Sequence, residues 1–134
     1  MKITASAISL NVDDVTASAT FVKQHFDFIE QMSADGFVSL AREDAGFNLV
    51  FLKTGLKSFK PIHMREHRSD GLLIAFVVDD IDTEYARLQS KGVPITTPIE
   101  TELWGERFFQ VTDPNGVVIQ LVQWMTQPDR ESVA

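Results

Sequence analysis

The chain has 134 residues, of which 44% are hydrophobic, and a formal net charge of −7 at pH 7. The acidic balance argues against a nucleic-acid partner, whose phosphates require a basic surface, and no apolar run approaches the roughly 18 residues that cross a bilayer. The chain has no cysteine, so disulfides, thiolate ligands and cysteine nucleophiles are excluded, and with no signal-peptide core after Met1 a cytoplasmic globular protein is expected.

The first half of the chain predicts one β-α-β-β-β unit. Residues 6–12 alternate between two faces, which indicates a strand with one face under a helix. Asp14 is placed to be the N-cap of a helix that runs to about His25 or Phe26, where His25 would suit the helix dipole. Strands are then expected at residues 28–32, 37–42 and 47–53.

The second half predicts the same order of elements. We expect a strand at residues 72–78, a helix at 81–90 that ends before Lys91-Gly92, and strands at 93–97, 106–111 and 117–124. Asp113-Pro114-Asn115-Gly116 suits a tight turn between the last two strands. The charged stretch 54–70 is predicted to be a connector, and residues 125–134 are predicted to be a C-terminal tail.

The two halves repeat one another. Asn11-Val12-Asp13-Asp14-Val15 returns 66 residues later as Val77-Val78-Asp79-Asp80-Ile81. Gly46-Phe47-Asn48-Leu49-Val50-Phe51 corresponds to Gly116-Val117-Val118-Ile119-Gln120-Leu121 at an offset of 70, which indicates about four added residues in the second copy. Each copy alone would have a marginal core, so we expect a pseudo-twofold protein with its site where the copies meet.

These features together resemble the glyoxalase, bleomycin-resistance and extradiol-dioxygenase superfamily, also called vicinal oxygen chelate proteins. The resemblance rests on the duplication, the Val-x-Asp-(apolar) start of each helix, and Trp104-Gly105-Glu106-Arg107-Phe108 before the Asp113 turn, over residues 3–124. It implies an α+β fold in which two tandem β-α-β-β-β units, about 3–53 and 71–124, form a curved mixed sheet around a cleft. The helices would lie on the outer face of this single domain, residues 1–134.

The resemblance also locates where metal-dependent members hold a divalent ion. These positions fall at Ala7 and Leu73 in the opening strands and at Val50 and Gln120 in the last strands. Only Gln120 has a donor atom, whereas such an ion requires three or four protein ligands. We therefore expect no metal and no cofactor, as in the non-metal branch whose members bind and sequester small molecules.

Two histidines, His63 and His67, are the remaining candidates for a metal or substrate role. His63 and His67 have the spacing that places two imidazoles on one face of a helix, but they lie in the charged connector after Pro61. A solvated surface loop is the favoured interpretation, and a metal or substrate role is the alternative.

A ligand site is expected on the inner face of the sheet. Small residues of the opening strands, Ser9 and Ala75, leave space, while Asn48 and Gln120 offer polar contacts. The further candidates are Phe37, Phe51, Met64 and Phe109, which are alternatively core residues. Trp104 is predicted to be an aromatic lid or else an ordinary half-buried indole at the sheet edge.

Arg107 is the one cationic candidate, and it would either hold an anionic or carbonyl group or pair with a surface acid. The sequence thus predicts a homodimer that binds and sequesters a small aromatic or amphipathic molecule, like a drug-resistance protein. The alternatives are a lyase, isomerase or dioxygenase with unusual metal ligands or none, using His63, His67 or Gln120, and a structural module whose cleft is filled.

Overall fold

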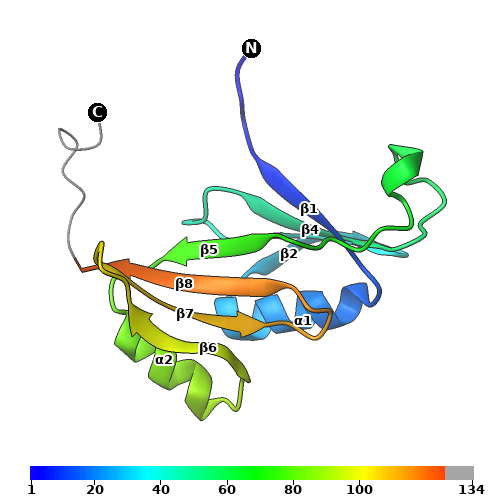
Figure 1. Cartoon of the computed structure of the whole chain (residues 1–134). Helices are drawn as coiled ribbons and strands as arrows, with labels where there is room; N and C mark the ends of the chain where they lie inside the picture. The colour runs from blue at the N-terminus through cyan, green and yellow to red at the C-terminus, as the bar shows by residue number, and fades with distance from the viewer. Residues whose placement is uncertain (126–134) are drawn as a thin grey trace. The chain divides into compact units, whose positions relative to one another are not determined.

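The computed structural model describes residues 1–125, so the predicted tail lies almost entirely outside the described residues. The elements, drawn in Figure 1, are β1 (Ala7–Val12), α1 (Val15–Phe26), β2 (Ile29–Ala34), β3 (Phe37–Ala41), β4 (Asn48–Lys53), the 3₁₀ turn η1 (Ile62–Met64), β5 (Leu73–Val77), α2 (Ile81–Ser90), β6 (Ile95–Thr101), β7 (Glu106–Thr112) and β8 (Val118–Trp124). This order confirms the α+β class and the tandem β-α-β-β-β units.

Contacts divide the chain into two compact units. The first contains residues 1–71 together with 113–115, and the second contains residues 72–112 and those from 116 onward. Each unit has its own four-stranded mixed sheet. A cleft formed by the two copies together, and their union in one domain, stay predictions.

In the first unit the strand order is β1-β4-β3-β2, with β1 parallel to β4 and the other pairs antiparallel. Alternation along the strands places Leu10, Leu40, Leu49 and Phe51 on one face, where each is at most 1% exposed. Helix α1 contacts β3 and β4. The core of the unit therefore lies between α1 and this face of the sheet.

The second unit repeats this arrangement in the order β5-β8-β7-β6, with α2 in contact with β7 and β8. Its register reproduces the two sequence offsets: Ala7 pairs with Asn48 in the first sheet, and Leu73 pairs with Val118 in the second. The second hairpin is longer than the first: the β6–β7 connection spans residues 102–105, whereas only Asp35 and Gly36 connect β2 and β3, and β6 and β7 are each longer than β2 and β3.

Both helices begin as the repeat requires. The Asp14 carboxylate accepts from the Ala17 amide at 3.1 Å, and the Asp80 carboxylate accepts from the Thr83 amide at 3.2 Å. Bonds from Thr83 also hold the pKa of Asp80 below its usual value. Each aspartate satisfies an amide that the first helical turn leaves unpaired.

The strand boundaries that differ most from the prediction are those of β6. The strand expected at residues 93–97 is β6, which begins at Ile95 and continues through Pro98 to Thr101. Its pairing with β7 is irregular between Thr97 and Glu100. Because β6 is the edge strand of its sheet, the missing amide of Pro98 is tolerated at this irregularity.

Candidate functional site

The face of the first sheet opposite α1 carries the small and polar side chains. Ser9 of β1 pairs with Val50 of β4, and Ala7 pairs with Asn48, so these four residues share one face. Ala7 and Ser9 are exposed, while Asn48 and Val50 are half-buried. Phe37, through its pairing with Leu52, belongs to the same face. The structure thus brings Ser9, Asn48 and Phe37 to one surface.

Asn11 attaches the connector to this surface. Its side-chain amide donates to the Met64 and His67 carbonyls, both at 3.0 Å. Its backbone amide donates to Ser69 Oγ at 2.8 Å, and the Ser69 amide donates to the Asn11 carbonyl at 2.9 Å. Asn11 is buried, and four hydrogen bonds therefore hold residues 64–69 at the end of β1.

A cavity of about 380 Å³ lies between this end of the sheet and the connector. Its lining residues are Ser9, Asn11, Leu52, Leu56, Ser58, Phe59, Lys60, Pro61, Met64 and Ser69. The volume and the mixture of apolar side chains with a few hydroxyls are those of a small-molecule pocket. We refer to it as the connector cavity.

The sequence predicted only two residues of the connector cavity, Ser9 and Met64. Leu56, Phe59 and Lys60 were missed because residues 54–70 were interpreted as a solvated connector. The available signal was the alternation of Leu56, Phe59, Ile62 and Met64 with charged residues, which indicates a segment with one apolar side. His63 and His67 are exposed, as a surface loop requires.

The second sheet has a comparable open face. Leu73 and Ala75 of β5 pair with Val118 and Gln120 of β8, and both β5 residues are exposed. The Gln120 side-chain oxygen accepts from Gln110 Nε2 at 2.8 Å. This face is apolar and small along β5, with one amide pair at its centre.

Three predicted site residues lie elsewhere. Phe51 and Phe109 are 0% exposed and belong to the cores of their units, and Phe109 contacts the ring of Tyr85 on α2. Arg107 pairs with Asp82 of α2, with Nη2 and Oδ1 2.8 Å apart.

This bond raises the pKa of Arg107. In the alternating register Arg107 lies on the face opposite to Gln110 and Gln120. Of the two alternatives for Arg107, the structure favours pairing with a surface acid.

Trp104 lies in the β6–β7 connection and is 61% exposed, next to the fully exposed Leu103. The Gly105 carbonyl accepts from the Met125 amide at 2.8 Å, which ties this connection to the end of β8. The indole is thus more exposed than an ordinary half-buried edge residue, and its role as a lid stays a prediction.

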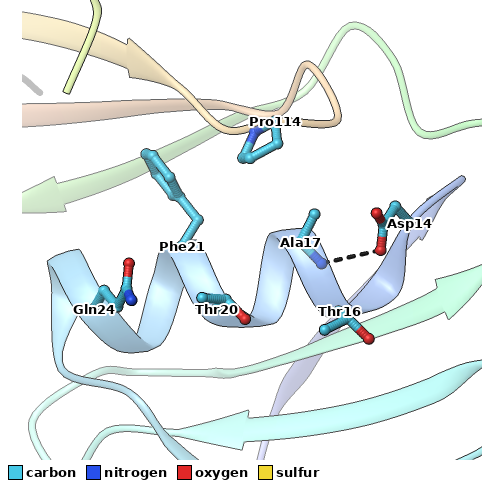
Figure 2. Close-up of a pocket in the computed structure, with 7 residues that line it drawn as sticks. All are labelled: Asp14, Thr16, Ala17, Thr20, Phe21, Gln24 and Pro114. Atoms are coloured by element: carbon cyan, nitrogen blue, oxygen red, sulfur yellow. Dashed lines mark hydrogen bonds between the residues drawn. The ribbon is translucent and has the colours of Figure 1, made fainter.

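A second hollow of about 360 Å³ runs along α1 and is shown in Figure 2. It is lined by Asp14, Thr16, Ala17, Thr20, Phe21, Gln24 and Pro114. Pro114 faces α1 in Figure 2 because the residues on either side of it form hydrogen bonds at the start of this helix. Ser18 Oγ donates to Asp113, and Asn115 Nδ2 donates to the Asp14 carbonyl. These contacts explain the hollow as the place where residues 113–115 pack on α1.

Comparison with known proteins identifies the family. Residues 4–121 match the model of the Glyoxalase/Bleomycin resistance protein/Dioxygenase superfamily. The chain belongs to this superfamily. An uncharacterised protein of Mycobacterium bovis is 28% identical over 116 residues, which cover 80% of this chain and 74% of that protein.

Solved structures of the superfamily share the fold. A glyoxalase/bleomycin resistance protein/dioxygenase from Nocardioides gives a TM-score of 0.79 at 18% identity, over 97% of this chain and 89% of the other. A lactoylglutathione lyase from Agrobacterium tumefaciens gives 0.72 at 16% identity, over 92% and 96%. At these identities the similarity establishes the fold alone.

The metal positions of this superfamily do not fit an ion in this chain. Ala7, Val50 and Leu73 supply no donor atom, and the Gln120 oxygen already accepts a hydrogen bond from Gln110. Within residues 1–125 no group of three or more His, Asp or Glu side chains is arranged to hold a metal. The same part of the chain contains no helix long and apolar enough to span a membrane.

Proposed function

We propose that this superfamily member binds and sequesters a small aromatic or amphipathic molecule, in the manner of a drug-resistance protein. The connector cavity carries this proposal. Its apolar side chains can enclose a ring, and Ser9 and Ser58 can bond to a polar substituent. Binding here needs no metal, which agrees with the donor-poor residues at the superfamily's metal positions.

Chemistry of the lyase or isomerase type has less support. General acid–base catalysis requires a group that titrates near neutral pH within reach of the substrate. Among residues 1–125, Lys60 is the only ionisable side chain that lines the connector cavity, and it is exposed. The cavity therefore supports binding rather than turnover.

Three matched phenylalanine substitutions test where binding occurs. Ser9→Phe places a ring in the connector cavity, Ala7→Phe places one on the same strand outside it, and Ala75→Phe places one on the open face of the second sheet. All three replace exposed residues, so little loss of stability is expected. The probes are 2-naphthamide, 2-naphthoate and 2-naphthylmethylammonium, followed by NMR titration of labelled protein.

We expect at least one probe to shift the amide resonances of Leu56 and Met64. Ser9→Phe should weaken its binding about tenfold or more, which corresponds to about 1.4 kcal/mol, whereas Ala7→Phe should leave it unchanged. If no probe binds at millimolar concentration, or if Ala75→Phe abolishes binding and Ser9→Phe does not, the connector cavity is not the site.

We also propose that the chain forms a homodimer. Leu73 and Val77 of β5 are 54% and 67% exposed, so the second sheet leaves apolar surface for a second copy to cover. Sedimentation at micromolar concentration should give twice the chain mass, and Val77→Glu should reduce the dimer because a charge would be buried. A wild-type monomer at high concentration would contradict this proposal.

A further inference from the structure

The segment that forms one wall of the connector cavity is basic in an acidic protein. Residues 53–68 contain five cationic side chains and one acid, Glu66. The cationic residues are Lys53, Lys57, Lys60, Arg65 and Arg68. The other 118 residues hold the remaining seven Lys and Arg and 18 of the 19 Asp and Glu. The whole chain is therefore acidic, with a net charge of −7, whereas this wall of the cavity is locally basic.

The lysines of this segment are available to a ligand. The two arginines have acidic partners: Arg65 Nε lies 3.6 Å from Glu66 Oε1, and Arg68 Nη1 lies 3.5 Å from Asp13 Oδ2. Across residues 1–125, by contrast, Lys53, Lys57 and Lys60 have no acidic partner within ion-pair distance. Lys60 itself lines the cavity, and no Asp or Glu of the described part of the chain does.

We infer that the connector cavity selects an anionic amphiphile, a molecule with an apolar or aromatic body and one carboxylate, sulfonate or phosphate group. The body would contact Leu52, Leu56 and Phe59, and the anionic group would lie at Lys60 with Ser58 as a hydroxyl donor. This inference rests on the proposed function and specifies its ligand class. The total charge of −7 would by itself favour a cationic or neutral ligand, so the inference depends on the local charge of this segment.

Screening by salt gives the charges nearest to the cavity the largest effect on a bound ligand. At physiological ionic strength, charges more than about 8 Å away are largely screened, so acids distant from the cavity contribute little to its potential. Lys60 is at the cavity itself, and Lys57 is three residues away in the same wall. An anion bound there would experience an attractive potential despite the acidic remainder of the chain.

The three naphthalene probes test the inference because they share one body and differ in charge. We expect 2-naphthoate to bind about fivefold more tightly than 2-naphthamide, and 2-naphthylmethylammonium to bind most weakly, as a single partly exposed charge contact would give. Lys60→Gln should remove the preference for 2-naphthoate, so that the ratio of the 2-naphthoate and 2-naphthamide affinities falls to about one. Lys60→Glu should reverse the order, so that the ammonium probe binds best.

Lys91→Gln is the matched control, since it makes the same charge change in the second unit. Raising NaCl from 50 to 500 mM should weaken 2-naphthoate but not 2-naphthamide. If the three probes bind equally, or if Lys60→Gln and Lys91→Gln have the same effect, the anion preference is wrong while the binding function stands. If no probe binds, the proposed function fails and the inference fails with it.

Discussion

Buried polar side chains fix segments that are distant in sequence. Among residues 1–125, Asn11, Ser18 and Asp113 are the polar or charged residues in the buried class. Asn11 holds the connector, and Ser18 Oγ donates to Asp113 while accepting from Asn115 Nδ2 at 2.7 Å. A buried polar group without its partner costs more than a typical hydrogen bond contributes, so each of these residues specifies one arrangement.

Removing the Ser18 hydroxyl should destabilise the fold. Ser18→Ala leaves Asp113, which is 4% exposed, with one hydrogen-bond donor fewer. The expected loss is about 1–3 kcal/mol in the free energy of unfolding, measured by urea titration. Thr20→Ala is the control, because Thr20 is exposed on the same helix. Equal urea midpoints for the two variants would show that the Ser18–Asp113 bond contributes nothing.

At the scale of elements, the β2–β3 turn and the connector constrain one another. Gly36 has a φ of +75°. Its carbonyl accepts a hydrogen bond from the Lys53 amide at the end of β4, at 2.9 Å. A Cβ at Gly36 would lie 3.0 Å from Leu56 Cδ1, a residue of the connector cavity. The turn therefore favours glycine for its backbone conformation, and an added Cβ would also require the end of the Leu56 side chain to shift.

Substitution of this glycine should affect both stability and binding. Gly36→Ala should lower the free energy of unfolding by about 1–3 kcal/mol, because left-handed backbone is strained for a residue with Cβ. It should also weaken probe binding, since Leu56 must move. Gly46→Ala is the control, for an added Cβ there has no atom within 4 Å. Thermal unfolding and the naphthalene titrations measure the two effects, and an unchanged Gly36→Ala protein would contradict both.

The folded molecule as a whole should not be stabilised by the divalent ions that some superfamily members bind. Because Ala7, Val50 and Leu73 lack donor atoms, Zn²⁺, Ni²⁺, Mn²⁺ and Fe²⁺ should not raise the melting temperature, as a tightly bound ion would by mass action. Any stabilisation that disappears in His63→Ala or His67→Ala would come from these exposed histidines. Stoichiometric binding that instead requires Gln120 would contradict the expectation.

The repeated architecture could be predicted from the amino-acid sequence alone. Its offsets of 66 and 70 residues became the strand register of both sheets, and Asp14 and Asp80 occupy equivalent caps. These features depend on local periodicity and on hydrogen bonds between close neighbours in sequence. Alternation also grouped Ser9 with Asn48, and Ala75 with Gln120, on one face of each sheet, because side chains along a strand point alternately to opposite sides.

What covers those faces is known only from the three-dimensional structure. Alternation assigns a residue to one of two faces but does not say which face lies under a helix. Phe51 lies on the face of β4 opposite to Asn48, and Phe109 and Arg107 lie on the face of β7 opposite to Gln110, so the structure removes all three from the open faces. The connector is fixed by bonds between Asn11 and residues more than 50 positions away. Such contacts leave no periodic signal in the chain, and they hold the connector against the end of β1 as the wall of a cavity.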